Sequence, residues 1–179
     1  MPEARPCADR IIEAGCRTTG RWGKANWIMR TYLVIIDETE EAEIALRFAA
    51  RRAAKTKGGL EILVIIPQQE FVAWGAVQAT IENEAREHAE AIVRHAMDTL
   101  AQESPMTPRI SVKAGDAVSA IRAALAENTE IGALVLAAAR GGNPGPLVSH
   151  FAGADSGTLP CPVMIVPGSL TNEALDRLS

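Results

Sequence analysis

Residues 31–40, TYLVIIDETE, decide the fold of this chain. The continuous apolar run Tyr32–Asp37 predicts a β-strand of the kind found in parallel sheets that helices cover on both faces. A helix is predicted over residues 40–57, where one stripe carries alanines at 42, 45, 49 and 53. Gly58 and Gly59 follow, and we expect them to end this helix by supplying a left-handed cap. The stretch therefore opens a strand-helix unit.

The same alternation continues along the chain. Strands are predicted over residues 60–66, 109–114, 133–138 and 163–166, and helices over 77–101, 117–127 and 147–158. Asp116 precedes the helix at 117–127 and is a suitable N-cap for it. Short β-rich runs between longer helical patterns indicate stacked βαβ units. The predicted fold class is therefore α/β, a five-stranded, mainly parallel sheet with four helices on its two faces. Right-handed crossovers favour the strand order 3-2-1-4-5.

The 179 residues suffice for one domain of ordinary size. Residues 30–168 carry the regular pattern, and residues 169–179 are a short C-terminal tail. Residues 1–29 show no sustained period and are an N-terminal extension with two open interpretations. Either translation starts at Met29 and the extension is a start-site artefact, or the extension is a flexible or partner-binding arm that carries Trp22 and Trp27.

Composition excludes several classes of function. A net charge of −4 and a pI near 5.4 argue against a nucleic-acid binder, which needs a basic face. No apolar run approaches the roughly 18 to 20 residues that span a bilayer, so no membrane partner is predicted. Three cysteines without a Cys-x-x-Cys pair support neither a disulfide framework nor a zinc site, and a reducing cytoplasm is the predicted location. The Gly-rich fingerprints of P-loop and dinucleotide sites are missing from the sequence, so no redox cofactor is predicted.

Two features of the predicted sheet converge on one crevice. Asp37 ends the strand at 32–37, and the loop ARGGNPGPLVS, residues 139–149, follows the strand at 133–138. In the order 3-2-1-4-5 the carboxyl ends of these two strands are neighbours. A carboxylate there can accept a hydrogen bond from adenine or ribose, and glycines let backbone N–H groups approach phosphate oxygens. The alternative interpretation is that Asp37 and Thr39 only cap a helix and that the loop is only a turn.

Three segments carry a resemblance to a known family. They are VIIDET at residues 34–39, ALVLAAARGG at 133–142 and LPCPVMIVP at 159–167. In order and spacing they resemble the universal stress protein family, over about residues 30–168. The resemblance implies a fold of the adenine nucleotide alpha hydrolase-like type. It also implies a homodimer formed through the strand at 163–166, and, in some members, binding of ATP or AMP.

In the nucleotide-binding members of that family, an Asp ends the first strand and a Gly-x2-Gly-x9-Gly-Ser/Thr loop follows the fourth. Asp37 matches the Asp, Gly141 matches the second glycine, and Ser149 is the equivalent of the final hydroxyl residue. Ala138 and Val148 replace the other two glycines, and the spacer is shorter by two residues. Pro144 and Pro146 remove two N–H donors from the loop. The nucleotide-binding residues implied are Asp37, Thr39, Ile65, Ala139, Arg140, Gly141, Gly142, Gly145 and Ser149.

The sequence is compatible with three functions. The first is a cytoplasmic stress-response module that binds ATP, with Mg²⁺, or AMP, without rapid turnover. The second is a nucleotide-independent dimeric interaction protein, which the altered loop favours. The third is an adenylating or phosphotransfer enzyme. No catalytic residue is predicted for it, and slow ATP hydrolysis is left open.

The histidines of the helix at 77–101 and Cys161 are predicted to have structural roles. His88 and His95, with Glu84, share a helix face, but seven residues span about 10 Å of helix, too far for one metal ion. No metal site is therefore predicted. Cys161, between two prolines, lacks the electropositive surroundings of a reactive thiol.

Overall fold

The computed structural model describes residues 30–66, 75–103 and 106–179, with side chains of the helix at 75–103 described from residue 83. Its elements alternate as the sequence predicts. In chain order they are β1 (Thr31–Ile36), α1 (Glu40–Thr56), β2 (Gly59–Ile66), α2 (Gly75–Glu103), β3 (Arg109–Ala114), α3 (Ala117–Glu127), β4 (Ile131–Ala138), α4 (Pro146–Ala152), β5 (Val163–Pro167) and α5 (Asn172–Leu178). The predictions made for residues 1–29 lie outside the described residues.

The five strands form one sheet in the order β3-β2-β1-β4-β5, and all neighbouring pairs are parallel. This confirms the predicted fold class and strand order. Val34 of β1 pairs with Val135 of β4, so the two strands end side by side at the same edge of the sheet. The residues that follow them, Asp37 and Ala139, therefore leave the sheet as neighbours, at the point where its topology reverses.

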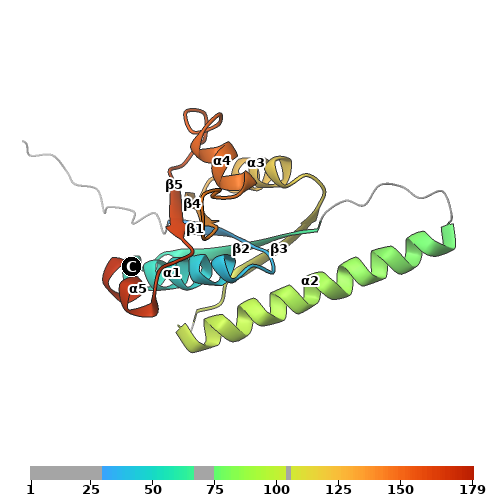
Figure 1. The fold of residues 1–179 in the computed structure, drawn as a ribbon, viewed down its shortest axis with the longest axis horizontal. Coiled ribbons are helices and arrows are strands. Elements are labelled where there is room, and N and C mark those ends of the chain that lie inside the picture. Colours follow the sequence, from blue (N-terminus) through green and yellow to red (C-terminus); the bar gives the residue numbers. More distant parts are fainter. Residues whose placement is uncertain (1–29, 67–74, 104–105) are drawn as a thin grey trace, which may run out of the picture.

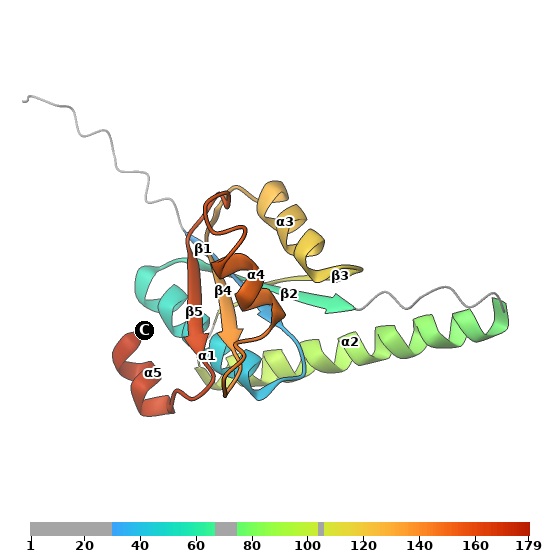
Figure 2. The same cartoon turned by 45° about the horizontal axis from the view of Figure 1, so that its top comes forward.

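Helices cover both faces of the sheet, and on each face the sheet and its helices pack together in one apolar cluster. Helices α1, α2 and α5 lie on one face, and α3 and α4 lie on the other (Figures 1 and 2). Val34 points into the cluster under α1, whereas Leu33 points into the cluster under α3 and α4. This alternation explains why residues 32–36 of β1 are all apolar. α2 is long and runs beyond the sheet at its N-terminal end (Figure 1).

The helix boundaries follow from local chemistry. Asp116 caps α3 as predicted, and its carboxylate accepts a hydrogen bond from the Ser119 N–H at 2.8 Å. The predicted glycine cap of α1 is wrong, because Lys57 takes the left-handed conformation, with φ of 53°. Gly58 is needed for a different reason: a Cβ there would collide with the carbonyl oxygen of Arg30. Its place beside the start of β1 excludes a side chain.

Two further expectations are corrected at the C-terminal end. α4 ends at Ala152 rather than at residue 158, and hydrogen-bonded turns follow, including one from the Thr158 N–H to the Asp155 carbonyl at 2.9 Å. The tail after Gly168 forms a fifth helix, α5, although the sequence pattern predicts only four helices. The amphipathic pattern in so short a segment is too brief to recognise without its packing partner.

α5 is held against α1 by buried and charged contacts. Leu175 is completely buried in the cluster under α1. The Arg51 guanidinium donates to Asp176 Oδ1 at 2.7 Å and binds Glu103 of α2 through Nε at 2.6 Å. Lys55 Nζ donates to the Ser179 carbonyl at 2.6 Å. Arg51 therefore joins three helices, and the tail is part of the folded body.

Candidate functional site

Asp37 begins the turn between β1 and α1, and its carboxylate is already engaged on one side. Oδ1 accepts hydrogen bonds from the Thr39 N–H at 3.0 Å and from Thr39 Oγ1 at 2.6 Å. Thr39 Oγ1 in turn accepts from the Ala42 N–H at 3.2 Å and caps α1. Thr39 is therefore the N-cap of α1, and Asp37 holds Thr39 in place rather than capping the helix itself. Oδ2 has no hydrogen bond to the described residues, so the exposed carboxylate keeps one oxygen for another donor.

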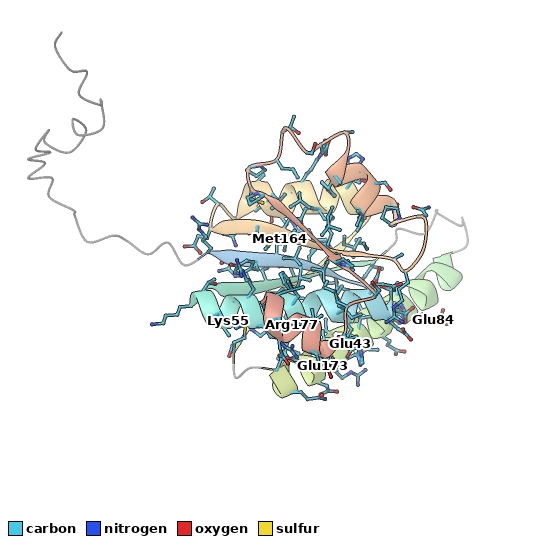
Figure 3. The ribbon with its side chains drawn as sticks, turned by 60° about the vertical axis from the view of Figure 1, so that its left-hand side comes forward. Glu43, Lys55, Glu84, Met164, Glu173 and Arg177 are labelled. Atoms are coloured by element: carbon cyan, nitrogen blue, oxygen red, sulfur yellow. The ribbon has the colours of Figure 1, made fainter. Side chains whose placement is uncertain are left out.

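A cavity of about 300 Å³ opens beside Asp37, between the start of α1 and the middle of α2. Its floor is apolar, with Ile36 and Leu46 from the body and Ile92 from α2. Its lining also includes the carboxylate residues Asp37, Glu38, Glu40 and Glu43. Glu43, one of these lining residues, is labelled in Figure 3. The residues that line this cavity come from the β1–α1 segment and α2, so the loop after β4 is not part of its wall.

The loop after β4 is a compact turn with bare glycines. The Ala139 N–H donates to the Pro144 carbonyl at 3.2 Å, which closes the turn. Gly141 and Gly145 have φ of 130° and 99°, a region that residues with a side chain avoid. No described atom lies within 4 Å of the position that a Cβ would take at Gly141, Gly142 or Gly145. The backbone of the loop therefore faces open space.

Arg140 fixes this loop to the rest of the protein. Its backbone N–H donates to Glu41 Oε1 at 3.2 Å, and its Nε donates to the Gly168 carbonyl at 2.6 Å. Its Nη1 lies 3.4 Å from Glu40 Oε2. Hydrogen bonds from the Glu41 backbone N–H and from Arg140 lower the pKa of the Glu41 carboxyl. The guanidinium thus connects the ends of β4 and β5 with the start of α1.

Ser149 lies in the first turn of α4, and both of its donors are used inside the helix. Its backbone N–H and its Oγ donate to the Gly145 carbonyl, at 3.0 Å and 2.8 Å. Ile65 packs against the cluster under α3 and α4, one strand away from Asp37. The predicted site residues therefore share the carboxyl edge of the sheet, but in different settings. Asp37 has a carboxylate oxygen to offer, the glycines offer backbone, and Arg140 and Ser149 are internally bonded.

Sequence reasoning missed the two carboxylates beside the loop. Glu40 and Glu41 begin α1, where acidic residues are common because they favour the helix dipole. That local explanation hides their contacts with Arg140, which lies 99 residues after Glu41. The acidic first turn of α1, directly after Asp37, was the feature of the sequence that could have indicated these two carboxylates.

A second polar cluster holds α4 in place on the other side of the sheet. The buried carboxylate of Asp155 accepts from Arg122 Nε at 2.8 Å and from Arg122 Nη2, and it lies 3.0 Å from His150 Nε2. Hydrogen bonding to Arg122, and then to His150, lowers the pKa of this carboxyl. Because Arg122 belongs to α3 and His150 belongs to α4, Asp155 links these two helices.

The two histidines of α2 contact separate carboxylates. His88 Nε2 lies 3.3 Å from Glu38 Oε1, and His95 Nε2 lies 3.8 Å from Glu43 Oε2. In the part of the chain that the structure describes, no three metal-ligating side chains gather in one place. These pairs connect α2 to the β1–α1 segment. None of the helices described has both the length and the apolar character that crossing a membrane requires.

Solved structures of similar fold include universal stress proteins. Universal stress protein UspA from Lactobacillus plantarum matches with a TM-score of 0.64 and 20% identity, over 77% of this chain and 97% of that one. A universal stress protein family member from Burkholderia pseudomallei matches with a TM-score of 0.56 and 14% identity, over 78% and 97%. A universal stress protein in complex with cAMP matches with a TM-score of 0.54 and 18% identity, over 78% and 98%.

These identities are low, so the structural matches establish the fold alone. No curated protein matches the chain. The model of the universal stress protein family matches residues 29–167, which is most of the chain. The predicted resemblance is confirmed, and this chain belongs to the universal stress protein family.

Proposed function

We propose that this chain is a cytoplasmic, homodimeric stress-response module that binds an adenine nucleotide between the carboxyl ends of β1 and β4, without rapid hydrolysis. Membership of the family and a structural neighbour solved in complex with cAMP support nucleotide binding. Cys161, a buried free thiol, is compatible with a reducing compartment. We assign no catalytic residue, because the carboxylates beside the loop, Glu40 and Glu41, contact Arg140.

The observation that carries the proposal is the bare backbone at Gly142. Unlike Gly141 and Gly145, Gly142 has no positive φ that would require glycine. No described atom lies within 4 Å of its Cβ position, so protein packing does not require glycine either. Such a glycine leaves the main chain open, and Gly142 does so in the loop where β4 ends beside β1, the place in a parallel sheet where a ligand can approach closely. Phosphate oxygens bound by loop N–H groups are such a ligand.

The nucleoside end would be read at the end of β1. Asp37 Oδ2 would accept a hydrogen bond from a ribose hydroxyl or from the adenine amino group. Ile65, partly buried at the end of β2, would provide apolar contact for the base. Asp37 keeps its bonds to Thr39 in this arrangement, because those bonds use the other carboxylate oxygen.

Replacing Gly142 tests the proposal directly. The variant Gly142→Val should fold with the wild-type melting temperature, because the added side chain enters open space. Its branched side chain should block the loop backbone and weaken AMP binding about tenfold or more, since one lost charge-assisted contact is worth that much. Isothermal titration calorimetry would measure the affinity.

Gly157→Val is the matched control. Gly157 is also exposed, has no positive φ and has open space around its Cβ position, but it lies in the turns after α4. AMP affinity should be unchanged in this variant. Equal AMP affinity in the wild type and Gly142→Val would rule out the loop as the phosphate site.

A nucleotide-independent interaction module is the second candidate. The internal hydrogen bonds of Arg140 and Ser149 favour it, because they remove donors that a phosphate would use. Absence of heat and of any thermal shift with millimolar adenosine, AMP and ATP would select this function over the first.

A further inference from the structure

The loop after β4 offers few hydrogen-bond donors for an anion. The Ala139 N–H is bound to the Pro144 carbonyl, the Arg140 N–H to Glu41, and the Gly145 N–H to Asn143 Oδ1 at 3.2 Å. Pro144 and Pro146 have no N–H to offer. Within residues 139–145, the N–H groups without a described acceptor belong to Gly141, Gly142 and Asn143. Three adjacent donors suit the oxygens of a single phosphate.

The charges around the loop point the same way. Arg140 is the cationic side chain of this loop; its Nε donates to the Gly168 carbonyl, and its Nη1 lies 3.4 Å from Glu40 Oε2. Glu41 places a carboxylate directly against the loop backbone. Asp37, Glu38 and Glu43 add three more acidic side chains around the neighbouring cavity. Arg47 pairs with Glu43 and Arg140 pairs with Glu40, so these five carboxylates still outnumber the two arginines. Each additional phosphate would bring negative charge toward a surface that is already net negative.

We infer that this site selects nucleotides with one phosphate, an adenosine monophosphate or its cyclic form, and discriminates against the triphosphate. The inference rests on the proposed nucleotide site and specifies its ligand class. One phosphate fits the three donors of Gly141, Gly142 and Asn143. The β- and γ-phosphates of a triphosphate would meet the carboxylates at the start of α1.

A ligand series on the wild-type protein tests the inference. Adenosine, AMP, cAMP and ATP are titrated by calorimetry in the presence of EDTA. Adenosine should bind more weakly than AMP, because it lacks the phosphate contacts. ATP should bind about tenfold more weakly than AMP, since several like charges at a protein surface together amount to about that factor. Added Mg²⁺ should narrow the difference, because it neutralises part of the triphosphate charge.

The variant Glu41→Gln identifies the source of the discrimination. Its amide oxygen can still accept the Arg140 N–H, but the charge beside the loop is gone. ATP affinity should rise about threefold or more while AMP affinity changes less, so the ratio of the two narrows. Glu40→Gln is a second variant with the same expected direction, and its exposed side chain makes it safe for folding. Glu130→Gln is the control. It makes the same change of charge just before β4, at the end of the strand opposite the loop, and should leave the ratio of ATP to AMP affinity unchanged.

The outcomes separate the two claims. If none of the four ligands binds, the proposed function fails and this inference fails with it. If ATP binds as tightly as AMP in EDTA, or adenosine binds as tightly as AMP, the inference is overturned while nucleotide binding stands. If the ratio of ATP to AMP affinity stays constant in both Glu41→Gln and Glu40→Gln, the carboxylates are not the cause of the selection, and the inference is overturned in that form.

Discussion

The residue Asp155 shows how one carboxylate can position two helices. Its side chain is buried, and both of its partners are cationic or can become so. Arg122 of α3 is charged at every accessible pH, so the pair persists as long as Asp155 is ionised. Protonation of Asp155 would weaken its hydrogen bonds to α3 and α4 together.

Acid should therefore reduce stability through Asp155. Its folded-state pKa is lowered by Arg122 and then by His150, below an unfolded value of about 3.9. The stabilisation is complete above the unfolded pKa and is lost as the pH falls through the folded pKa. In urea unfolding at pH 7 and at pH 3, Asp155→Asn should lose less stability on acidification than the wild type does.

Asp98→Asn is the control for that experiment, because Asp98 is exposed on α2 and the change of charge is the same. It should show the pH dependence of the wild type. Identical pH dependence in the wild type and Asp155→Asn would mean that the Asp155 contacts do not stabilise the fold.

Residues whose partners are local were the predictable ones. Asp37 and Thr39 are two residues apart, and the sequence suggested both their capping role and their place at the crevice. Glu41 and Gly168 could not be predicted, because their roles depend on distant chain segments. A Cβ at Gly168 would collide with Glu41 and lie 2.8 Å from the Ala138 carbonyl, and this crowding arises only once β4, β5 and α1 have assembled.

Among the elements, α5 was missed and is firmly attached. Its seven residues present one buried side chain, Leu175, and polar groups of Asn172 and Asp176 accept hydrogen bonds from α1. Short helices draw their stability from such tertiary contacts rather than from their own sequence. The strands were predictable for the opposite reason, because an apolar run covered on both faces is a signal within the strand itself.

Truncating Leu175 should therefore destabilise the whole protein. Leu175→Ala leaves a cavity in the cluster under α1, and we expect a loss of about 2–4 kcal/mol in the free energy of unfolding. Urea denaturation followed by circular dichroism would measure it. Leu178→Ala is the control, because Leu178 belongs to the same helix and is 56% exposed. If both variants unfold at the wild-type midpoint, α5 is not docked in solution.

On the scale of the whole molecule, the two sheet edges differ in their proposed use. β5 is an edge strand, and Ile165 on it is 43% exposed. Such an edge, with unpaired backbone groups and an apolar side chain, favours pairing with a second copy. β3 forms the opposite edge, where Val112 is 48% exposed, so exposure alone does not distinguish them. The family resemblance is the reason that we propose a homodimer interface at β5 rather than at β3.

Sedimentation equilibrium at micromolar concentration tests this assignment. The wild type should be a dimer, and Ile165→Lys should be a monomer because it places a charge in the interface. Val112→Lys, the same type of change on the other edge, should remain a dimer. A monomeric wild type would refute the homodimer, and a monomer formed only by Val112→Lys would move the interface to β3.

The proposed function requires that a ligand contacts the loop after β4. The most direct measurement is a nuclear magnetic resonance titration of the isotope-labelled protein with AMP, observed at assigned backbone amides. The amides of Gly141, Gly142 and Asn143 should shift with increasing AMP, and that of Gly157 should stay in place. Shifts confined to other parts of the chain, or no shifts at millimolar AMP, would contradict the proposed site.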